Sequence, residues 1–128
     1  MADVNRGNRP LSPHATIYRW PLNAIMSILH RITGTAMALG AVLVVWWFLA
    51  AATSAEYFAT VDGVLTSWIG DLVLFLSLLA LSYHLMNGVR HLIWDTGAGF
   101  DNESTQQSGI IGLVLAVVIA ALLLAATW

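Results

Sequence analysis

Three long stretches of apolar residues dominate the chain, and charged side chains occur only near or beyond their ends. Residues 32–55, 72–89 and 104–128 contain no Asp, Glu, Lys or Arg. About 20 apolar residues suffice for a helix to cross a bilayer, and none of the stretches shows the period-two alternation of a barrel strand. The pattern predicts an all-α membrane protein with three transmembrane helices in a bundle, near 23–52, 64–94 and 106–128.

Turn-forming residues separate the predicted helices. Asp62-Gly63 precedes the second helix, and Gly97 and Gly99 follow it. Ser104 and Gln107 have the spacing of a capping box ahead of the third helix. The proline-containing stretch before residue 22 is too short to span a bilayer. We therefore expect residues 1–22 to form a cytoplasmic or interfacial segment and residues 23–128 to form the three-helix anchor.

Composition supports a membrane location and excludes several kinds of site. The chain is 59% hydrophobic and 9% charged, whereas soluble domains carry about 25% charged residues. It contains no cysteine, which excludes disulfides, thiolate metal sites and iron–sulfur ligation by this chain. The net charge of −2 gives no indication of a nucleic-acid partner. The expected surroundings are membrane lipid.

The arginines predict the orientation of the chain. Four precede or begin the first predicted helix and one lies near the end of the second, namely Arg6, Arg9, Arg19, Arg31 and Arg90. The first inter-helix loop has no Lys or Arg, so the positive-inside rule places the N-terminus in the cytoplasm or matrix and the C-terminus on the opposite side. Tryptophans cluster near both interfaces and agree: Trp20 and Trp94 inside, and Trp46, Trp47, Trp68 and Trp128 outside. We expect no secretory signal or transit peptide, which favours a bacterial inner membrane over a mitochondrial one.

Histidines on the second predicted helix suggest a haem site. Residues at spacings of three and four form one polar and small-residue stripe: Ser77, Leu81, His84, Gly88, His91 and Asp95. A neutral imidazole is a common axial haem ligand, and Gly88 leaves space beside His84 for a flat macrocycle. His91 lies about 10 Å further along the axis, so it cannot bind the same iron. It either reaches a propionate or is an interfacial histidine, and His84 could instead only hydrogen-bond a neighbouring helix.

The first predicted helix carries an arginine inside its membrane span. Arg31 lies one turn after Ser27, and together they offer a cation and a hydroxyl to a carbonyl oxygen such as that of a quinone. The alternative is that Arg31 contacts a lipid phosphate. His30 lies at a depth similar to that of His84, which leaves an intrachain bis-histidine haem open. We expect the second ligand to come from another chain.

Two motifs resemble the cytochrome b subunit of succinate dehydrogenase. The first is Arg9-Pro10-Leu11-Ser12-Pro13-His14 with Ile17-Tyr18 and Ser27-Ile28-Leu29-His30-Arg31-Ile32-Thr33-Gly34. The second is His84-Leu85-Met86-Asn87-Gly88-Val89-Arg90-His91-Leu92-Ile93-Trp94-Asp95-Thr96-Gly97. They cover about a third of the chain. Ala15 departs from the larger aliphatic residue expected there.

The resemblance implies a three-helix anchor of succinate:quinone oxidoreductase, with partners and cofactors that this chain lacks. A second three-helix anchor would supply the other ligand of a haem b, and an iron–sulfur subunit and a flavoprotein would lie on the inner face. His84 would be one axial ligand of the haem iron, with His30, Arg31 and more weakly His91 near the propionates. Ser27 and Arg31 would line a pocket for ubiquinone or menaquinone. Succinate oxidation itself would occur on the flavoprotein.

Three alternatives to a haem-containing redox anchor remain. The chain could be a haem-free structural anchor whose histidines only pack between helices, or the anchor of a fumarate reductase. A small proton or ion carrier using Arg31 and His84 is disfavoured, because the polar stripes are confined to the inner half of the predicted spans.

Overall fold

The computed structural model describes residues 12–127, which form four α-helices: α1 (Leu22–Thr53), α2 (Ala55–Leu65), α3 (Trp68–Asp95) and α4 (Asn102–Thr127). Three of them, α1, α3 and α4, are long and apolar enough to cross a membrane, which confirms the predicted fold class. Arg6, Arg9, the start of the first motif and Trp128 lie outside the described residues. Residues 12–21 contain one turn and no helix.

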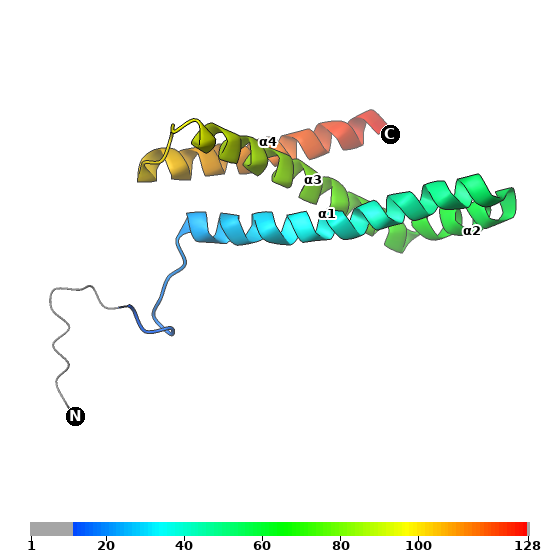
Figure 1. Ribbon diagram of the computed structural model, residues 1–128, viewed down its shortest axis with the longest axis horizontal. Coiled ribbons are helices and arrows are strands. Elements are labelled where there is room, and N and C mark those ends of the chain that lie inside the picture. The colour runs from blue at the N-terminus through cyan, green and yellow to red at the C-terminus, as the bar shows by residue number, and fades with distance from the viewer. Residues whose placement is uncertain (1–11, 128) are drawn as a thin grey trace, which may run out of the picture.

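The short helix α2 was not predicted, because Asp62-Gly63 was interpreted as a turn before the second span. Ser54 adopts an extended conformation (φ −162°, ψ 155°) that ends α1, and its hydroxyl accepts a hydrogen bond from the Tyr57 amide at 3.1 Å. A serine at this position caps the next helix. The helix then runs back along the end of α1, and this α1–α2 hairpin extends beyond the C-terminal end of α4 (Figure 1).

Side-chain contacts explain why α2 returns along α1. The indole of Trp47 donates to the carboxylate of Asp62 at 3.0 Å, and the indole of Trp46 donates to the hydroxyl of Tyr57 at 2.8 Å. Ala50 and Val61 are almost fully buried between the two helices. Asp62 is therefore an internal residue of α2 with a tertiary partner, and the interpretation of Asp62-Gly63 as a turn is wrong.

Both remaining connections are short and have defined ends. Gly97 and Gly99 follow α3 with φ of +85° and +75°, a left-handed conformation that glycine adopts without strain. The predicted capping box is wrong in its first residue, because Ser104 lies inside α4. Asp101 caps that helix, and its carboxylate accepts from the Ser104 amide at 2.8 Å.

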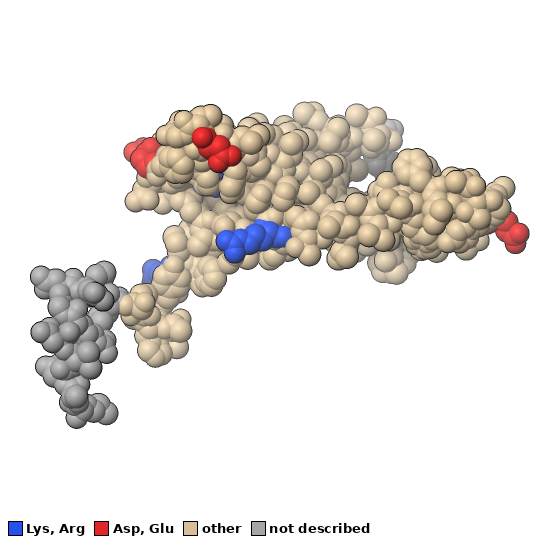
Figure 2. All heavy atoms as spheres, viewed as in Figure 1, with Lys and Arg blue, Asp and Glu red and all other residues tan. Residues whose placement is uncertain are grey.

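The helix α3 lies between α1 and α4 and packs against both (Figure 1). Few side chains are buried within the chain, and the buried apolar ones are Met26, Ala50, Val61, Tyr83, Ala116 and Ala120. Most large apolar side chains remain exposed, as expected for helices that face lipid or other subunits. Acidic side chains appear at the two ends of the molecule, while one basic patch lies on the flank of α1 (Figure 2). Arg31 is the only Lys or Arg in α1.

Candidate haem and quinone site

The imidazole of His84 is held against α1 by its Nδ1 atom. This nitrogen lies 3.1 Å from the backbone carbonyl oxygen of His30 and 3.3 Å from the hydroxyl of Thr33. A carbonyl oxygen only accepts, so Nδ1 must carry the proton. In this tautomer Nε2 has the free lone pair, and it makes no hydrogen bond within residues 12–127 and is not buried. Histidines that ligate a metal commonly have their other nitrogen fixed by a backbone carbonyl in the same way.

His30 lies between the two histidines of α3. Its ring stacks on His84 with centroids 3.9 Å apart and an interplanar angle of 13°, and on His91 at 5.1 Å and 16°. Parallel rings at 3.9 Å leave no room for a macrocycle between them, so this arrangement does not support His30 and His84 as two ligands of one iron. The Nδ1 atom of His30 is buried without a partner, whereas Nε2 is not buried. The edge of His30 available to a ligand is therefore Nε2.

His91 continues the column of rings toward the end of α3. Its Nδ1 lies 2.9 Å from the backbone oxygen of Asn87, and its ring centroid lies 5.0 Å from that of Trp94. As for His84, the bond to a carbonyl fixes the proton on Nδ1. The sequence placed His84 and His91 on one stripe, but it did not show that a side chain of α1 inserts between them.

Two glycines beside His84 have different surroundings. A Cβ atom built on Gly34 would lie 2.9 Å from Cε1 of His84, closer than ordinary contact, so α1 and the imidazole touch directly there. A Cβ on Gly88 would meet nothing within 4 Å. The open space predicted beside Gly88 is therefore present. These residues fit a haem: a free Nε2, a ring held from behind, and space on the same stripe of α3.

Ser27 and Arg31 form a pair on the flank of α1. The guanidinium Nη2 donates to the Ser27 hydroxyl at 3.5 Å, and this is the only side-chain hydrogen bond of Arg31 within residues 12–127. Gly34, which touches His84, follows Arg31 by three residues and so lies on the same side of α1. Arg31 is exposed. The pair therefore presents a cation and a hydroxyl on the same side of α1 as Gly34, which contacts the His84 ring.

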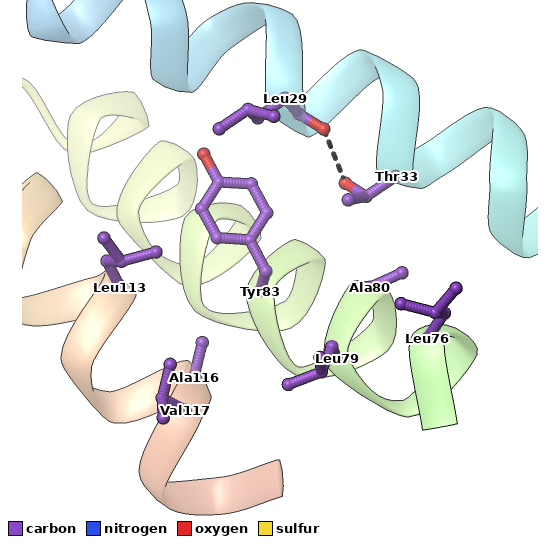
Figure 3. A pocket seen from close by; sticks show the side chains of 9 residues that line it. All are labelled: Leu29, Thr33, Leu76, Leu79, Ala80, Tyr83, Leu113, Ala116 and Val117. Carbon is purple, nitrogen blue, oxygen red and sulfur yellow. Dashed lines mark hydrogen bonds between the residues drawn. The ribbon is translucent and has the colours of Figure 1, made fainter. Parts of the chain in front are cut away.

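Neither of two cavities that α1 helps to line is formed by these residues. The first, about 310 Å³, lies between α1, α3 and α4 and is lined by the nine residues labelled in Figure 3. Its two hydroxyl-bearing residues are satisfied, since Thr33 donates to Leu29 O at 2.9 Å and Tyr83 to Met26 O at 2.8 Å. The second, about 610 Å³, lies between the α1–α2 hairpin and α3. None of the predicted site residues lines either cavity.

Sequence reasoning missed the environment of Arg90, which it used only as a marker of orientation. Arg90 is 5% exposed and lies among polar groups of α1, α3 and α4 rather than at a surface. A charged residue inside an apolar span, one position from the histidine stripe, was the available signal. Within residues 12–127 no group of three or more His, Asp or Glu side chains could hold a bare metal ion.

Known proteins resemble this chain over almost its whole length. The family described as "Succinate dehydrogenase/Fumarate reductase transmembrane subunit" matches residues 5–125. The chain is 52% identical over 124 residues to the succinate dehydrogenase cytochrome b556 subunit of Paracoccus denitrificans, covering 97% of this chain and 95% of that protein. It is 36% identical over 115 residues to the subunit of the same name from Rickettsia bellii, covering 90% of each. The mitochondrial succinate dehydrogenase cytochrome b560 subunit of Sus scrofa is 40% identical over 114 residues, which cover 86% of this chain and 66% of that protein.

The matched region includes both motifs and all four helices, apart from the last two residues of α4. The three apolar spans agree with a transmembrane subunit. The chain belongs to the succinate dehydrogenase/fumarate reductase transmembrane subunit family.

Proposed function

We propose that the chain is the haem b-containing membrane anchor of a succinate dehydrogenase and contributes to its quinone-reduction site. One observation carries the proposal: the Nδ1 atom of His84 donates to the backbone of α1, the helix that carries Ser27 and Arg31, so that Nε2 stays free. With one nitrogen fixed by a carbonyl, the imidazole offers its other nitrogen in the tautomer that can bind a metal. The names of the relatives agree with a cytochrome b.

His84 would hold the haem iron through Nε2, and the exposed edge of His30 would lie close enough to contact a haem substituent. When bound, the haem supplies a one-electron redox centre inside the membrane. His91 has its Nδ1 proton committed to Asn87 O, so only its Nε2 could contact a propionate. We infer that another subunit would supply the other ligand of the haem iron, because the His30 ring is stacked directly on the His84 ring.

Ser27 and Arg31 would bind one carbonyl oxygen of a quinone. Arg31 donates only to Ser27 within residues 12–127, so its remaining N–H groups can donate to a ligand. The Ser27 hydroxyl accepts from Arg31 and keeps its own proton to donate. As electrons reach the quinone, negative charge develops on the carbonyl oxygen, and a fixed cation beside it stabilises that charge. The alternative, a lipid phosphate bound by Arg31, would leave quinone reduction independent of Ser27.

The proposed surroundings follow from the same residues. A second three-helix anchor would cover the exposed flank of α1, and an iron–sulfur subunit and a flavoprotein would deliver electrons from succinate at the inner face. We place the chain in a bacterial inner membrane, with the N-terminus cytoplasmic and the C-terminus periplasmic. Because the chain has no cysteine, Ala98→Cys and Ala55→Cys can be labelled singly in intact cells. Only the residue-55 variant should react with an impermeant maleimide, and the reverse pattern would invert the topology.

The haem assignment is tested by the optical spectrum of the purified complex. His84→Ala should remove the low-spin b-type haem spectrum. His14→Ala is the control, because His14 is exposed before α1 and, within residues 12–127, its ring hydrogen-bonds only to Thr16. A wild-type complex without haem would favour the haem-free anchor, and an unchanged spectrum in His84→Ala would exclude His84 as ligand.

The quinone assignment is tested by comparing two electron acceptors. Ser27→Ala and Arg31→Lys should lower succinate–quinone activity about tenfold or more, the loss expected for a hydrogen bond to a charged group. Succinate oxidation with a soluble dye should be unchanged. Thr35→Val is the control, since the Thr35 hydroxyl donates to the Arg31 backbone oxygen on the same helix. Equal losses with both acceptors would contradict a quinone site.

A further inference from the structure

A buried arginine at the end of α3 takes no part in the site described above. The side chain of Arg90 enters the junction of α1, α3 and α4 and makes four hydrogen bonds. Its Nε donates to Ser108 Oγ at 3.1 Å, its Nη1 to Asn87 Oδ1 at 3.3 Å, and its Nη2 to Asn23 Oδ1 at 3.1 Å and to Thr105 O at 2.6 Å. These five residues, Asn23, Asn87, Arg90, Thr105 and Ser108, are called the Arg90 cluster below.

The acceptors around Arg90 are all neutral. No Asp or Glu of residues 12–127 forms an ion pair with it, and the guanidinium carbon lies 4.1 Å above the centroid of the Trp94 ring. A charge inside a membrane protein is costly and usually serves a function. Lysine offers a point charge, whereas the planar guanidinium directs several donors in fixed directions. The cluster therefore needs the shape of arginine, because its acceptors come from three different helices.

The cluster is connected to both halves of the proposed site. Asn23 precedes Ser27 by one turn of α1, and Asn87 follows His84 by three residues of α3. Arg90 bonds to both amides. Any shift of α1 along α3 would lengthen these bonds, and the same shift would move Ser27 relative to His84. A second hydrogen bond also joins α3 to α1, from the Tyr83 hydroxyl to Met26 O at 2.8 Å.

We propose that Arg90 is a positioning residue, which fixes α1 against α3 and so keeps the Ser27–Arg31 pair in place relative to the His84 ring. It touches neither quinone nor haem. Its effect on quinone reduction rests on the proposed function, but its effect on helix register does not. Both effects can be measured separately in the assembled complex.

The functional test uses Arg90→Lys, which keeps the charge, and Asn23→Ala, which removes the α1 acceptor. Each should raise the KM for quinone about threefold or more, since small displacements in a binding site cost large factors, while succinate–dye activity stays unchanged. The double variant should raise the KM by less than the product of the two single effects, because both changes break the bond from Arg90 Nη2 to Asn23 Oδ1. Asn23→Asp keeps an acceptor oxygen and should retain the wild-type KM. Arg19→Lys, at an exposed arginine before α1, is the matched control.

The register test needs no cofactor or activity. Residues 40 and 77 face each other across α1 and α3, since a Cβ on Gly40 would lie 3.8 Å from Ser77 Oγ. The cysteine pair Gly40→Cys and Ser77→Cys should cross-link readily in the complex, and adding Arg90→Lys should slow cross-linking severalfold, whereas adding Arg19→Lys should not.

The outcomes separate the two proposals. Slower cross-linking in a complex that lacks haem and quinone activity would refute the proposed function and support the register role. Unchanged cross-linking, a wild-type KM in Arg90→Lys, or additive effects in the double variant would each overturn the role of Arg90. A loss of thermal stability with unchanged KM and cross-linking would reduce Arg90 to a purely structural residue and also overturn it.

Discussion

Replacing Gly34 by alanine tests the contact that orients His84. The new methyl carbon would lie 2.9 Å from His84 Cε1, whereas ordinary van der Waals contact begins at about 3.4 Å. The imidazole must therefore move by roughly half an ångström. It is a rigid ring held at 3.1 Å from His30 O and stacked at 3.9 Å on the His30 ring, so the movement weakens one or both contacts.

The expected cost follows from those contacts. A hydrogen bond between helices in a membrane contributes about 0.6 kcal/mol on average, and a typical protein hydrogen bond up to about 1.5 kcal/mol. Haem retention by the Gly34→Ala complex should therefore fall about three- to tenfold. The assay is the haem content of the purified complex during challenge with a haem-binding apoprotein, together with the midpoint potential of the haem, which should shift as the ligand reorients.

Gly40→Ala provides a matched control for Gly34→Ala. Gly40 lies on the same helix at the same α1–α3 interface, but its Cβ would make an ordinary contact of 3.8 Å with Ser77. Both variants gain the same helix propensity, so the comparison isolates the contact with His84. Equal haem retention and equal midpoint potentials in the two variants would show that the contact between residue 34 and His84 does not orient the imidazole.

Three further predictions concern single contacts. Trp47→Phe removes the donor to Asp62, so the amides of α2 should exchange with solvent about three- to tenfold faster, measured by hydrogen exchange, while α4 is unaffected. Hydrogen bonds from the side chain and backbone of Ser104 hold the pKa of Asp101 below its usual value. The ionised Asp101 cap therefore stabilises α4 fully above pH ~4, and this stabilisation is lost as the pH falls through the lowered pKa. First-turn amide exchange in α4 should accelerate only in that acidic range, and Asp101→Asn should abolish this dependence. Thr33→Val leaves the hydrogen bond from His84 Nδ1 to His30 O intact and should change haem retention by less than about twofold. A complete loss of haem in this variant would contradict the His84 tautomer assigned from that bond.

The apolar pattern was enough to predict the three spans, because each is a long stretch without charge that only a helix can carry through lipid. It could not predict α2, an 11-residue helix that depends on tertiary contacts of Trp46 and Trp47 with its side chains. Such short helices have little stability of their own. The turn signal of Asp62-Gly63 comes from two adjacent residues, whereas the contact that overrides it joins Asp62 of α2 to Trp47 of α1.

For the site residues too, the sequence predicts relations within one helix but not contacts between helices. Spacing within one helix placed His84 and His91 on a common stripe and Ser27 one turn from Arg31, and the structure reproduces both relations. Spacing gives no information about how two helices meet. The insertion of His30 between the α3 histidines and the junction formed by Arg90 depend on the register of α1, α3 and α4. Small residues such as Gly34 and Gly109 permit the close approach of these helices, and composition does not distinguish them from the other glycines.

The exposure of α1 bears on what completes the proposed site. Only 6% of the apolar 18-residue stretch of α1 is buried within the chain, against 17% of the corresponding stretches of α3 and α4. The exposed side chain of Arg31 belongs to this least buried helix. A guanidinium facing lipid tails is unfavourable, and Arg31 has one weak protein partner at 3.5 Å. The least buried of the three spans thus carries an exposed cation, and the His84 ring contacts the same helix at Gly34. We infer that this flank of α1 contacts the second anchor subunit, which would supply the other haem ligand and the remaining wall of the quinone pocket.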